Sequence, residues 1–283
     1  MTKKPGYDSL AITYDSLIEN SPYYVNIRAA EKKLLLNAIQ KSSSRRFLDI
    51  GCGTGFALQV AALYGLEVYG VDPSVAMLEV ARRRLDLLGF KKGHLINCRA
   101  ENLSKMQEPF DIIVALGSVI NHIDNWEAFF RSIQENSQKG TQLLLTVDNK
   151  LGLDAFTWAF YLFICGKYYG LSDLYKRLLA VKQNKPHLNE WTFKTLNNQN
   201  TVHLRYESPK KVFQLLEKYG FRTIKIMGTN CLASLSMATI LSCEELFQQK
   251  TRVGSLLSSI DRQISKHVWP LSGNYVIWAE RTN

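Results

Sequence analysis

The chain has 283 residues, of which 46% are hydrophobic and 21% are charged. This length and composition are those of a globular protein with a continuous apolar core, and they exclude a disordered chain and a bundle of membrane-spanning helices. Thirty-five basic and twenty-five acidic residues give a net charge of +10, which attracts nucleic acid, anionic lipid or acidic metabolites.

Short apolar strands alternate with amphipathic helices through the first half of the chain, which is typical of a parallel sheet with crossover helices. Strands are expected over 46–50, 67–71, 94–98, 110–115 and 141–147. Helices are expected over 56–64, 74–88 and 126–136. Five strands in this order predict an open α/β sheet.

The alternation stops after residue 148. Aromatic residues crowd 151–170, a helix is expected over 171–182, and 190–196 with 201–206 predict a hairpin. The α/β pattern returns at Ser208 and Pro209, which suit the N-cap and first position of a helix. A strand over 221–227, helices within 243–266 and a strand over 275–280 follow. The chain therefore divides into a helical N-terminal lid (1–45), an α/β core (46–150), an insertion (151–206) and a part that completes the sheet (207–283).

The N-terminus carries lysines without an apolar segment behind them, so it predicts neither a secretory signal nor a transit peptide, and we expect a cytoplasmic protein. The most apolar later stretch, 156–165, is too short to cross a bilayer. Five scattered cysteines predict neither a zinc site nor a disulfide framework, and we expect reduced thiols.

Glycine stands at every second position between the first strand and the next helix, at Gly51, Gly53 and Gly55. Such a turn allows positive φ and a close approach of the backbone to a ligand at the start of a helix. A dinucleotide site would need another glycine at Phe56, and no phosphate-binding Gly-Lys-Ser/Thr follows. Asp49, two residues earlier, favours a cationic amino-acid group over a pyrophosphate. An ordinary strand-to-helix connection is the alternative.

A second carboxylate, Asp72, ends the second strand, directly before Pro73 and Ser74. At this place it can accept hydrogen bonds from both hydroxyls of a ribose. The alternative is that Asp72 only caps the helix that follows.

These segments, LDIGCGTG (48–55), GVDPS (70–74), AENL (100–103) and FDII (110–113), resemble in order and spacing the motifs of class I S-adenosylmethionine-dependent methyltransferases. The resemblance covers residues 7 to 148 and, more loosely, the last sheet elements. It implies a Rossmann-like α/β fold: a seven-stranded sheet with helices on both faces and a partly helical insertion before the last strands.

The resemblance also implies a site for S-adenosylmethionine, with the glycine turn against methionine and ribose, Asp49 near the methionine amino group and Asp72 on the ribose. Tyr7 and Tyr14 resemble the lid of the family, although packing alone would also explain them. The predicted cofactor-binding residues are Tyr14, Asp49, Gly51, Gly53, Gly55, Asp72, Pro73, Ala100, Glu101, Leu116, Gly117 and Ser118.

One position departs from the family pattern. Arg99 stands where an acidic residue commonly accepts a hydrogen bond from the adenine amino group, and arginine cannot accept one. We expect Glu101 or a backbone carbonyl near Cys98 to take this role.

Methyl transfer from a sulfonium needs alignment and exclusion of water, and it needs a general base only when the acceptor must lose a proton. His122 follows the fourth strand and is the candidate base, with Asn121 orienting the acceptor; a purely structural histidine is the alternative. No metal is expected.

The leading interpretation is methylation of an O or N atom of a small-molecule metabolite, under an aromatic cover formed by the insertion, although packing of an extra layer explains these aromatic residues equally well. Methylation of RNA is an alternative that the positive charge motivates. The third interpretation is a protein without catalytic activity that binds S-adenosylmethionine and a partner protein. The oligomeric state does not follow from the sequence.

Overall fold

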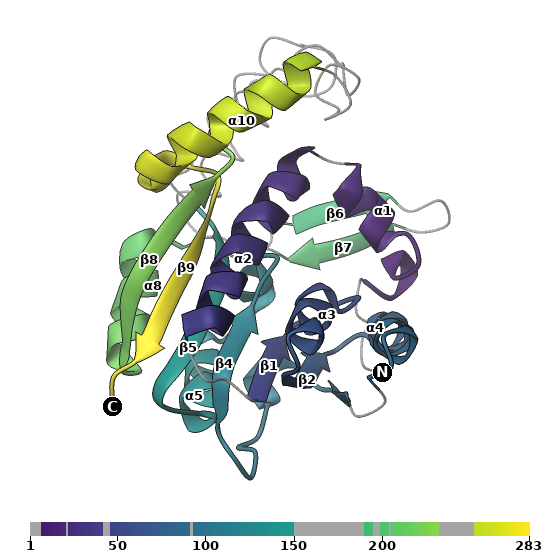
Figure 1. Cartoon of the computed structure of the whole chain (residues 1–283), viewed down its shortest axis with the longest axis vertical. Helices are drawn as coiled ribbons and strands as arrows, with labels where there is room; N and C mark the ends of the chain where they lie inside the picture. The colour runs from purple at the N-terminus through teal and green to yellow at the C-terminus, as the bar shows by residue number, and fades with distance from the viewer. Residues whose placement is uncertain are drawn as a thin grey trace.

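The computed structural model describes residues 7–20, 22–41, 46–90, 93–149, 190–194, 199–203, 205, 207–231 and 252–283. Their main feature is a seven-stranded sheet with the order β3-β2-β1-β4-β5-β9-β8 (Figure 1). The aromatic segment 151–170, the helix expected over 171–182, and residues 243–251 of the segment expected to hold helices lie outside the described residues. The strands of the sheet are β1 (Arg46–Ile50), β2 (Glu67–Asp72), β3 (His94–Asn97), β4 (Phe110–Ala115), β5 (Ser137–Asp148), β8 (Phe221–Thr229) and β9 (Asn274–Arg281).

Strands β1 to β5 are parallel, and β9 runs antiparallel to both of its neighbours, β5 and β8. The predicted seven-stranded α/β sheet is therefore confirmed, and its first five strands lie where the alternating pattern places them. A separate antiparallel pair, β6 (Glu190–Lys194) and β7 (Gln199–His203), confirms the predicted hairpin pairing.

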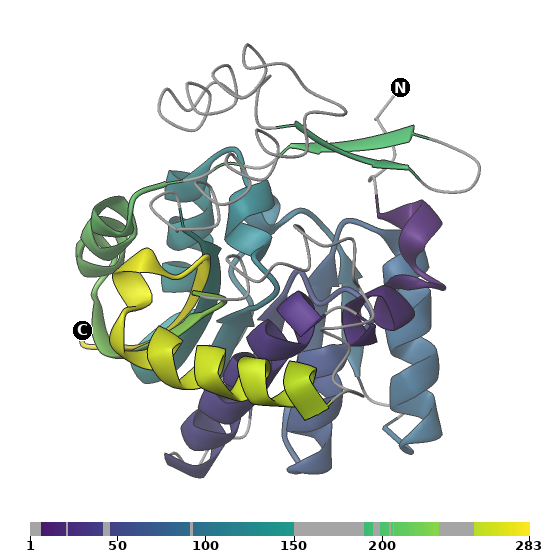
Figure 2. The ribbon, with the colours of Figure 1, turned by 90° about the horizontal axis from the view of Figure 1, so that it is seen from above.

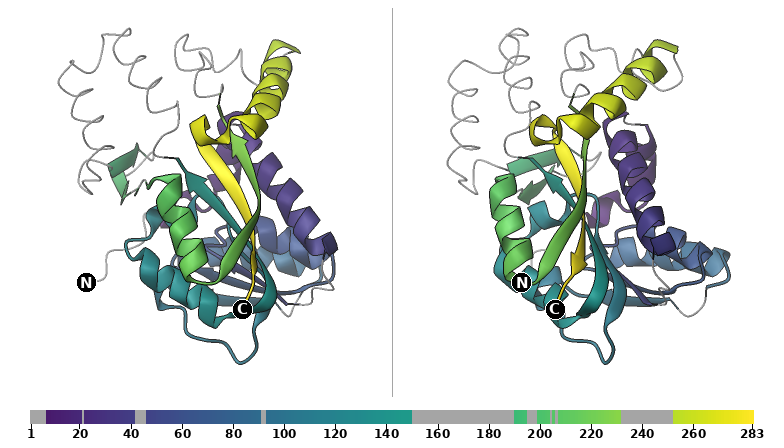
Figure 3. Two further views of the ribbon diagram at one scale, coloured as in Figure 1. Left: turned by 90° about the vertical axis from the view of Figure 1, so that its left-hand side faces the viewer. Right: turned by 60° about the vertical axis from the view of Figure 1, so that its left-hand side comes forward.

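Helices cover both faces of the sheet (Figure 2 and Figure 3). On one face lie α2 (Pro22–Lys41), α3 (Phe56–Leu63) and α4 (Val75–Leu87); on the other lie α5 (Trp126–Glu135) and α8 (Pro209–Lys218). Helix α10 (Arg252–His267) lies beyond the ends of β8 and β9 and contacts β8 and α2. Each face buries its own apolar cluster, with Leu34, Leu58 and Leu78 in the first and Phe129, Phe130 and Leu215 in the second. Short helices complete the described chain: η1 (Asp8–Leu10), α1 (Tyr14–Glu19), η2 (Ala100–Asn102), η3 (Val119–His122) and η5 (Trp269–Leu271).

Helix caps were predicted with mixed success. Ser74 caps α4 as expected, because its side chain accepts a hydrogen bond from the amide of Met77 at 3.2 Å. Ser208 is the N-cap residue of α8 and Pro209 stands at its start, as expected, although the Ser208 side chain makes no capping hydrogen bond.

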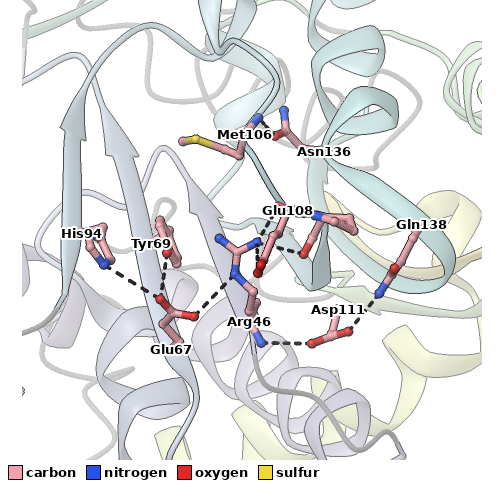
Figure 4. A network of polar contacts seen from close by, with 10 residues as sticks. Arg46, Glu67, Tyr69, His94, Met106, Glu108, Asp111, Asn136 and Gln138 are labelled. Atoms are coloured by element: carbon pink, nitrogen blue, oxygen red, sulfur yellow. Dashed lines mark hydrogen bonds and ion pairs between the residues drawn. The ribbon is translucent and has the colours of Figure 1, made fainter.

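Ion pairs fasten the amino end of the parallel strands, where Arg46 begins β1 (Figure 4). Its guanidinium lies 3.4 Å from Glu67 and 3.5 Å from Glu108, and its amide donates to Asp111 at 3.0 Å. Gln138 donates to the other oxygen of Asp111 at 3.3 Å. These contacts tie β1, β2, β4 and β5 together at this end, so a ligand site is expected at the opposite, carboxyl edge.

Within the described ranges, no helix is both long enough and apolar enough to cross a membrane.

Candidate active site at the carboxyl edge of the sheet

The glycine turn after β1 has the predicted backbone, with φ values of 72° at Gly51, 51° at Gly53 and 88° at Gly55. It is closed on one side, since a Cβ added to Gly51 would lie 2.7 Å from Cγ1 of Val119 and still closer to Cγ2. At Gly53 an added Cβ would meet no atom within 4 Å. The turn therefore presents its backbone to open space at Gly53, as a ligand cradle requires.

Asp72 joins the end of β2 to this turn. Its Oδ2 accepts from the amide of Gly53 at 2.9 Å, and its Oδ1 accepts from the amide of Ser74 at 2.8 Å. Burial raises the pKa of the Asp72 carboxyl, and these two hydrogen bonds lower it. An ionised carboxylate has about four acceptor sites. Asp72 can therefore hold the turn and the helix and still accept from a ligand.

Asp49 lies deep in the sheet, with 3% of its surface exposed, between Gly70 of β2 and Val114 of β4. Burial raises the pKa of Asp49 to about 8, and the nearby charge of Arg28 opposes this rise. A carboxyl group with so high a pKa is poorly stabilised in its ionised form by the protein alone. A cationic ligand group beside it would restore the charge.

Helix α2 brings an ion pair that the sequence analysis missed. Glu31 is buried and accepts from the amide of Gly117 at 2.6 Å, from the Thr146 hydroxyl at 2.5 Å and from Arg28 at 2.8 Å. Arg28 lies over the Phe56 ring, 4.7 Å from its centroid, and its Nη2 is 3.4 Å from the position of a Cβ added to Gly117. The pair thus fixes the loop after β4 and holds a cation beside it.

The other residues predicted at this loop have different environments. Leu116 is 5% exposed and packs in the apolar cluster of its face, so it faces the site only through its backbone. Ser118 has a positive φ of 60°, and its hydroxyl donates to Asp148 at the end of β5. Burial raises the pKa of the Tyr14 hydroxyl, and the charge of Arg28 opposes this rise.

At the β3 side, Glu101 pairs with Arg99 at 3.2 Å, so the two residues discussed for the adenine contact bind each other. The carbonyl of Ala100 accepts from Ser132 at 3.1 Å, and the carbonyl of Pro73 accepts from Asn97 at 2.9 Å. The predicted roles of Pro73, Ala100 and Glu101 in binding the cofactor stay predictions.

The N-terminal segment lies against the glycine turn and the start of α4. Asp8 accepts from the Ser74 hydroxyl, and Asp15 accepts from the Thr54 hydroxyl at 2.8 Å and pairs with Arg84. These contacts bring η1 and α1 to the edge where a lid would lie.

The two predicted catalytic residues differ in what they contact. The Nε2 atom of His122 lies 3.1 Å from the Tyr7 hydroxyl, and the two rings are 5.5 Å apart at 89°. Asn121 is 1% exposed; it donates to the carbonyl of Arg205 at 2.7 Å and accepts from the amide of Asp148 at 2.9 Å. His122 therefore meets the lid segment, whereas Asn121 ties η3 to β5.

Comparisons with known proteins agree with this geometry. Residues 24–226 match a family described as a methyltransferase domain. The chain belongs to the class I S-adenosylmethionine-dependent methyltransferases. Among the relatives of this methyltransferase, the probable S-adenosylmethionine-dependent methyltransferase CRG1 of Saccharomyces cerevisiae is 29% identical over 71% of this chain and 64% of its own. The mitochondrial ubiquinone biosynthesis O-methyltransferase of Rattus norvegicus is 28% identical over 39% of this chain and 33% of its own. The matches therefore span less than two thirds of either relative.

The fold of the methyltransferase is shared with solved structures. An S-adenosylmethionine-dependent methyltransferase from Clostridium acetobutylicum superposes with a TM-score of 0.61 at 12% identity, over 99% of this chain and all of that one. The CcbJ methyltransferase from Streptomyces caelestis gives a TM-score of 0.57 at 13% identity, over the same shares.

Proposed function

We propose that the protein transfers a methyl group from S-adenosylmethionine to an O or N atom of a small-molecule acceptor. The observation that carries this proposal is the pair of carboxylates, Asp49 and Asp72, at the ends of neighbouring strands on either side of a glycine turn that is open at Gly53. When bound, S-adenosylmethionine supplies a methyl group on a positively charged sulfur, and the protein has to align the acceptor and exclude water.

The side chains at this edge fit the groups of the cofactor. Asp49 offers a carboxyl group for the methionine ammonium, and Arg28 offers a guanidinium for the methionine carboxylate. Asp72 accepts from the ribose hydroxyls, and the backbone at Gly53 admits the ligand. The remaining proposed cofactor contacts are Tyr14, Gly51, Gly55, Pro73, Ala100, Glu101, Leu116, Gly117 and Ser118.

The acceptor is proposed to enter beside the ends of β4 and β5, next to the cofactor in the strand order. His122 is proposed as the general base, and it lies within hydrogen-bond reach of the lid tyrosine, Tyr7. Asn121 is proposed to support the acceptor by fixing η3, because its side chain is buried between backbone groups. The insertion over 151–206 is proposed as the cover of this side.

Local charge favours a small molecule over RNA. Although the whole chain carries +10, this edge holds the carboxyl groups of Asp72 and Asp148, while Asp49 is mostly protonated at pH 7 and Glu31 is paired with Arg28. A phosphate backbone gains affinity from Lys and Arg, and carboxylates repel it. A neutral or cationic acceptor suits this edge better.

Transfer of a labelled methyl group tests the proposal. The protein is incubated with S-adenosylmethionine labelled in its methyl group, together with a low-molecular-weight metabolite extract or with total RNA. We expect label in the metabolite fraction, and about ten- to a hundredfold less of it with the Asp72→Ala variant at a cofactor concentration below saturation. Label in RNA would support the RNA alternative, and cofactor binding without transfer to either fraction would support a catalytically silent protein.

Two further points stay predictions. A cytoplasmic location is proposed from the sequence alone, and the rat relative carries the word mitochondrial in its name. Reduced thiols and the absence of a metal are proposed for the whole chain; among the described residues, Cys52 and Cys98 are free thiols, and no group of three or more side chains could bind a metal ion.

A further inference from the structure

Asp148, at the carboxyl end of β5, is a half-buried carboxylate whose two oxygens have different surroundings. Its Oδ1 accepts both from the Ser118 hydroxyl and from the Asn274 amide group, the latter at 2.6 Å. Its Oδ2 accepts no hydrogen bond from any side chain or amide that the structure describes. One oxygen is thus held in place and the other is available.

The charge of Asp148 is not balanced by the protein around it. Burial raises the pKa of Asp148 to about 6, and the hydrogen bonds from Ser118 and Asn274 oppose the rise, so the group is ionised at neutral pH. Both donors are neutral, and within the described ranges no Lys, Arg or His forms an ion pair with Asp148. An ionised carboxylate withdrawn from water is costly unless a cation pairs with it.

A buried polar network fixes the direction of this carboxylate. Asn274, which holds Oδ1, accepts from Asn230 at 3.1 Å, and Asn230 accepts from Asn26 of α2 at 3.4 Å. Ser118 and Asn230 are the two non-glycine residues of the described chain with positive φ, each at 60°. Backbone strain of this kind persists where surrounding contacts enforce it, and it is common at binding sites.

Two tyrosines of the N-terminal segment, Tyr7 and Tyr24, are influenced by the charge of Asp148. Burial is the main reason why the pKa of Tyr7 and that of Tyr24 are raised, and the charge of Asp148 adds to both shifts, so the two hydroxyls lie within electrostatic range of this carboxylate. Tyr7 in turn contacts His122, the proposed base. Aromatic rings near a carboxylate suit an organic cation, because the negative face of a ring attracts positive charge.

From this juxtaposition we infer that Asp148 selects a cationic acceptor, an amine whose ammonium group binds Oδ2 while its apolar part lies against Tyr7 and Tyr24. This inference rests on the proposed function, and it narrows the acceptor atom to nitrogen. An ammonium nitrogen has no free electron pair. One N–H proton must therefore pass to the imidazole of His122, which leaves a neutral amine and a protonated histidine before methylation.

Calorimetry on the protein saturated with S-adenosylhomocysteine tests the inference without measuring turnover. The probes are 2-phenylethylamine, its neutral analogue 2-phenylethanol and the anion 3-phenylpropanoate. Asp148→Asn removes the charge but keeps an oxygen that accepts from Ser118 and Asn274. Asp124→Asn is the matched control, because that side chain is 88% exposed and the variant loses the same charge.

We expect the amine to bind the wild type at least about tenfold more tightly than either analogue, and Asp148→Asn to weaken it about ten- to a hundredfold. Asp124→Asn should stay within roughly twofold of the wild type. Undetectable amine binding, equal amine binding by Asp148→Asn, or tighter binding of the alcohol or the anion would overturn the inference.

The loading step separates this result from a failure of the proposed function. Each protein is first titrated with S-adenosylhomocysteine. If the wild type does not bind it, the proposed function fails. If the wild type binds S-adenosylhomocysteine but Asp148→Asn does not, Asp148 belongs to the cofactor site. The inference is then overturned, while the proposed function stands.

Discussion

Replacing Gly53 with alanine separates a ligand-binding role of the glycine turn from a structural one. Gly53 has a φ of 51°, and an added Cβ would meet no atom within 4 Å, so the cost in the free protein is backbone strain alone. Gly65, just beyond α3, has a φ of 79° and equally open surroundings. Each substitution should cost about 1–2 kcal/mol, because L-residues pay roughly this amount in the left-handed region.

The two alanine variants should therefore unfold alike and bind differently. Their melting temperatures should fall by similar amounts, roughly 2–4 °C for each kcal/mol. In calorimetric titrations with S-adenosylhomocysteine, Gly65→Ala should keep its affinity within roughly twofold. Gly53→Ala should lose at least about tenfold, since its methyl group fills space that the cofactor needs. Equal affinities for the two variants would refute the placement of the cofactor over Gly53.

Three other predictions follow from the same geometry. Asp49, with a pKa of about 8, is mostly protonated at pH 7, so pairing with a ligand ammonium should release up to about one proton. Titrations with S-adenosylhomocysteine in buffers of different ionisation enthalpy measure this release, and a release that persists in Asp49→Asn would contradict the pairing. His122→Asn should lower kcat by about 10²- to 10⁴-fold with unchanged S-adenosylhomocysteine affinity, and unaltered kcat would exclude it as the base. In Gly51→Ala the new methyl group crowds Val119, and the variant should lose about 1–3 kcal/mol of stability. Adding Val119→Ala should recover part of this lost stability, as measured by thermal unfolding. A double variant no more stable than Gly51→Ala would show that the crowding is not the cause of the loss.

The ends of the strands could be predicted because local patterns specify them. The apolar segment that ends in Asp49-Ile50 and the segment that ends in Asp72 are short, and turn residues bound each one. In a parallel sheet the carboxyl ends share one edge, so Asp49 and Asp72 were expected together without knowledge of the packing. The structure has them near enough for the charge of Asp72 to raise the pKa of Asp49.

The contributions of α2 were missed because their partners are distant in sequence. Glu31 binds Gly117 and Thr146, which follow it by 86 and 115 residues. A local signal did exist: Ile27, Glu31 and Leu34 follow the helical repeat, and a carboxylate in a buried stripe needs polar partners. The pattern indicates that Glu31 is buried, but it does not identify what binds it.

Asp148 was missed although it ends β5 as Asp72 ends β2. The apolar pattern predicts that this strand ends at Val147, and neither a helix cap nor a glycine turn follows to mark Asp148. Its significance depends on Ser118 and Asn274, which come from different parts of the chain. In the same way, Ser208 met the sequence rule for a cap, but the hydrogen bond is absent.

A titration with S-adenosylhomocysteine, comparing the wild type with Asp72→Ala and Ser74→Ala, tests the central claim most directly. Ser74→Ala removes the cap of α4 and the hydroxyl that donates to Asp8, at a cost of about 1 kcal/mol in stability, but it keeps the Asp72 carboxylate and should therefore bind within a few-fold of the wild type. Asp72→Ala should bind about ten- to a hundredfold more weakly, because a charged hydrogen-bond partner is lost. Undetectable binding by folded wild-type protein, or equal affinity in Asp72→Ala, would contradict the claim that this edge of the sheet holds the cofactor.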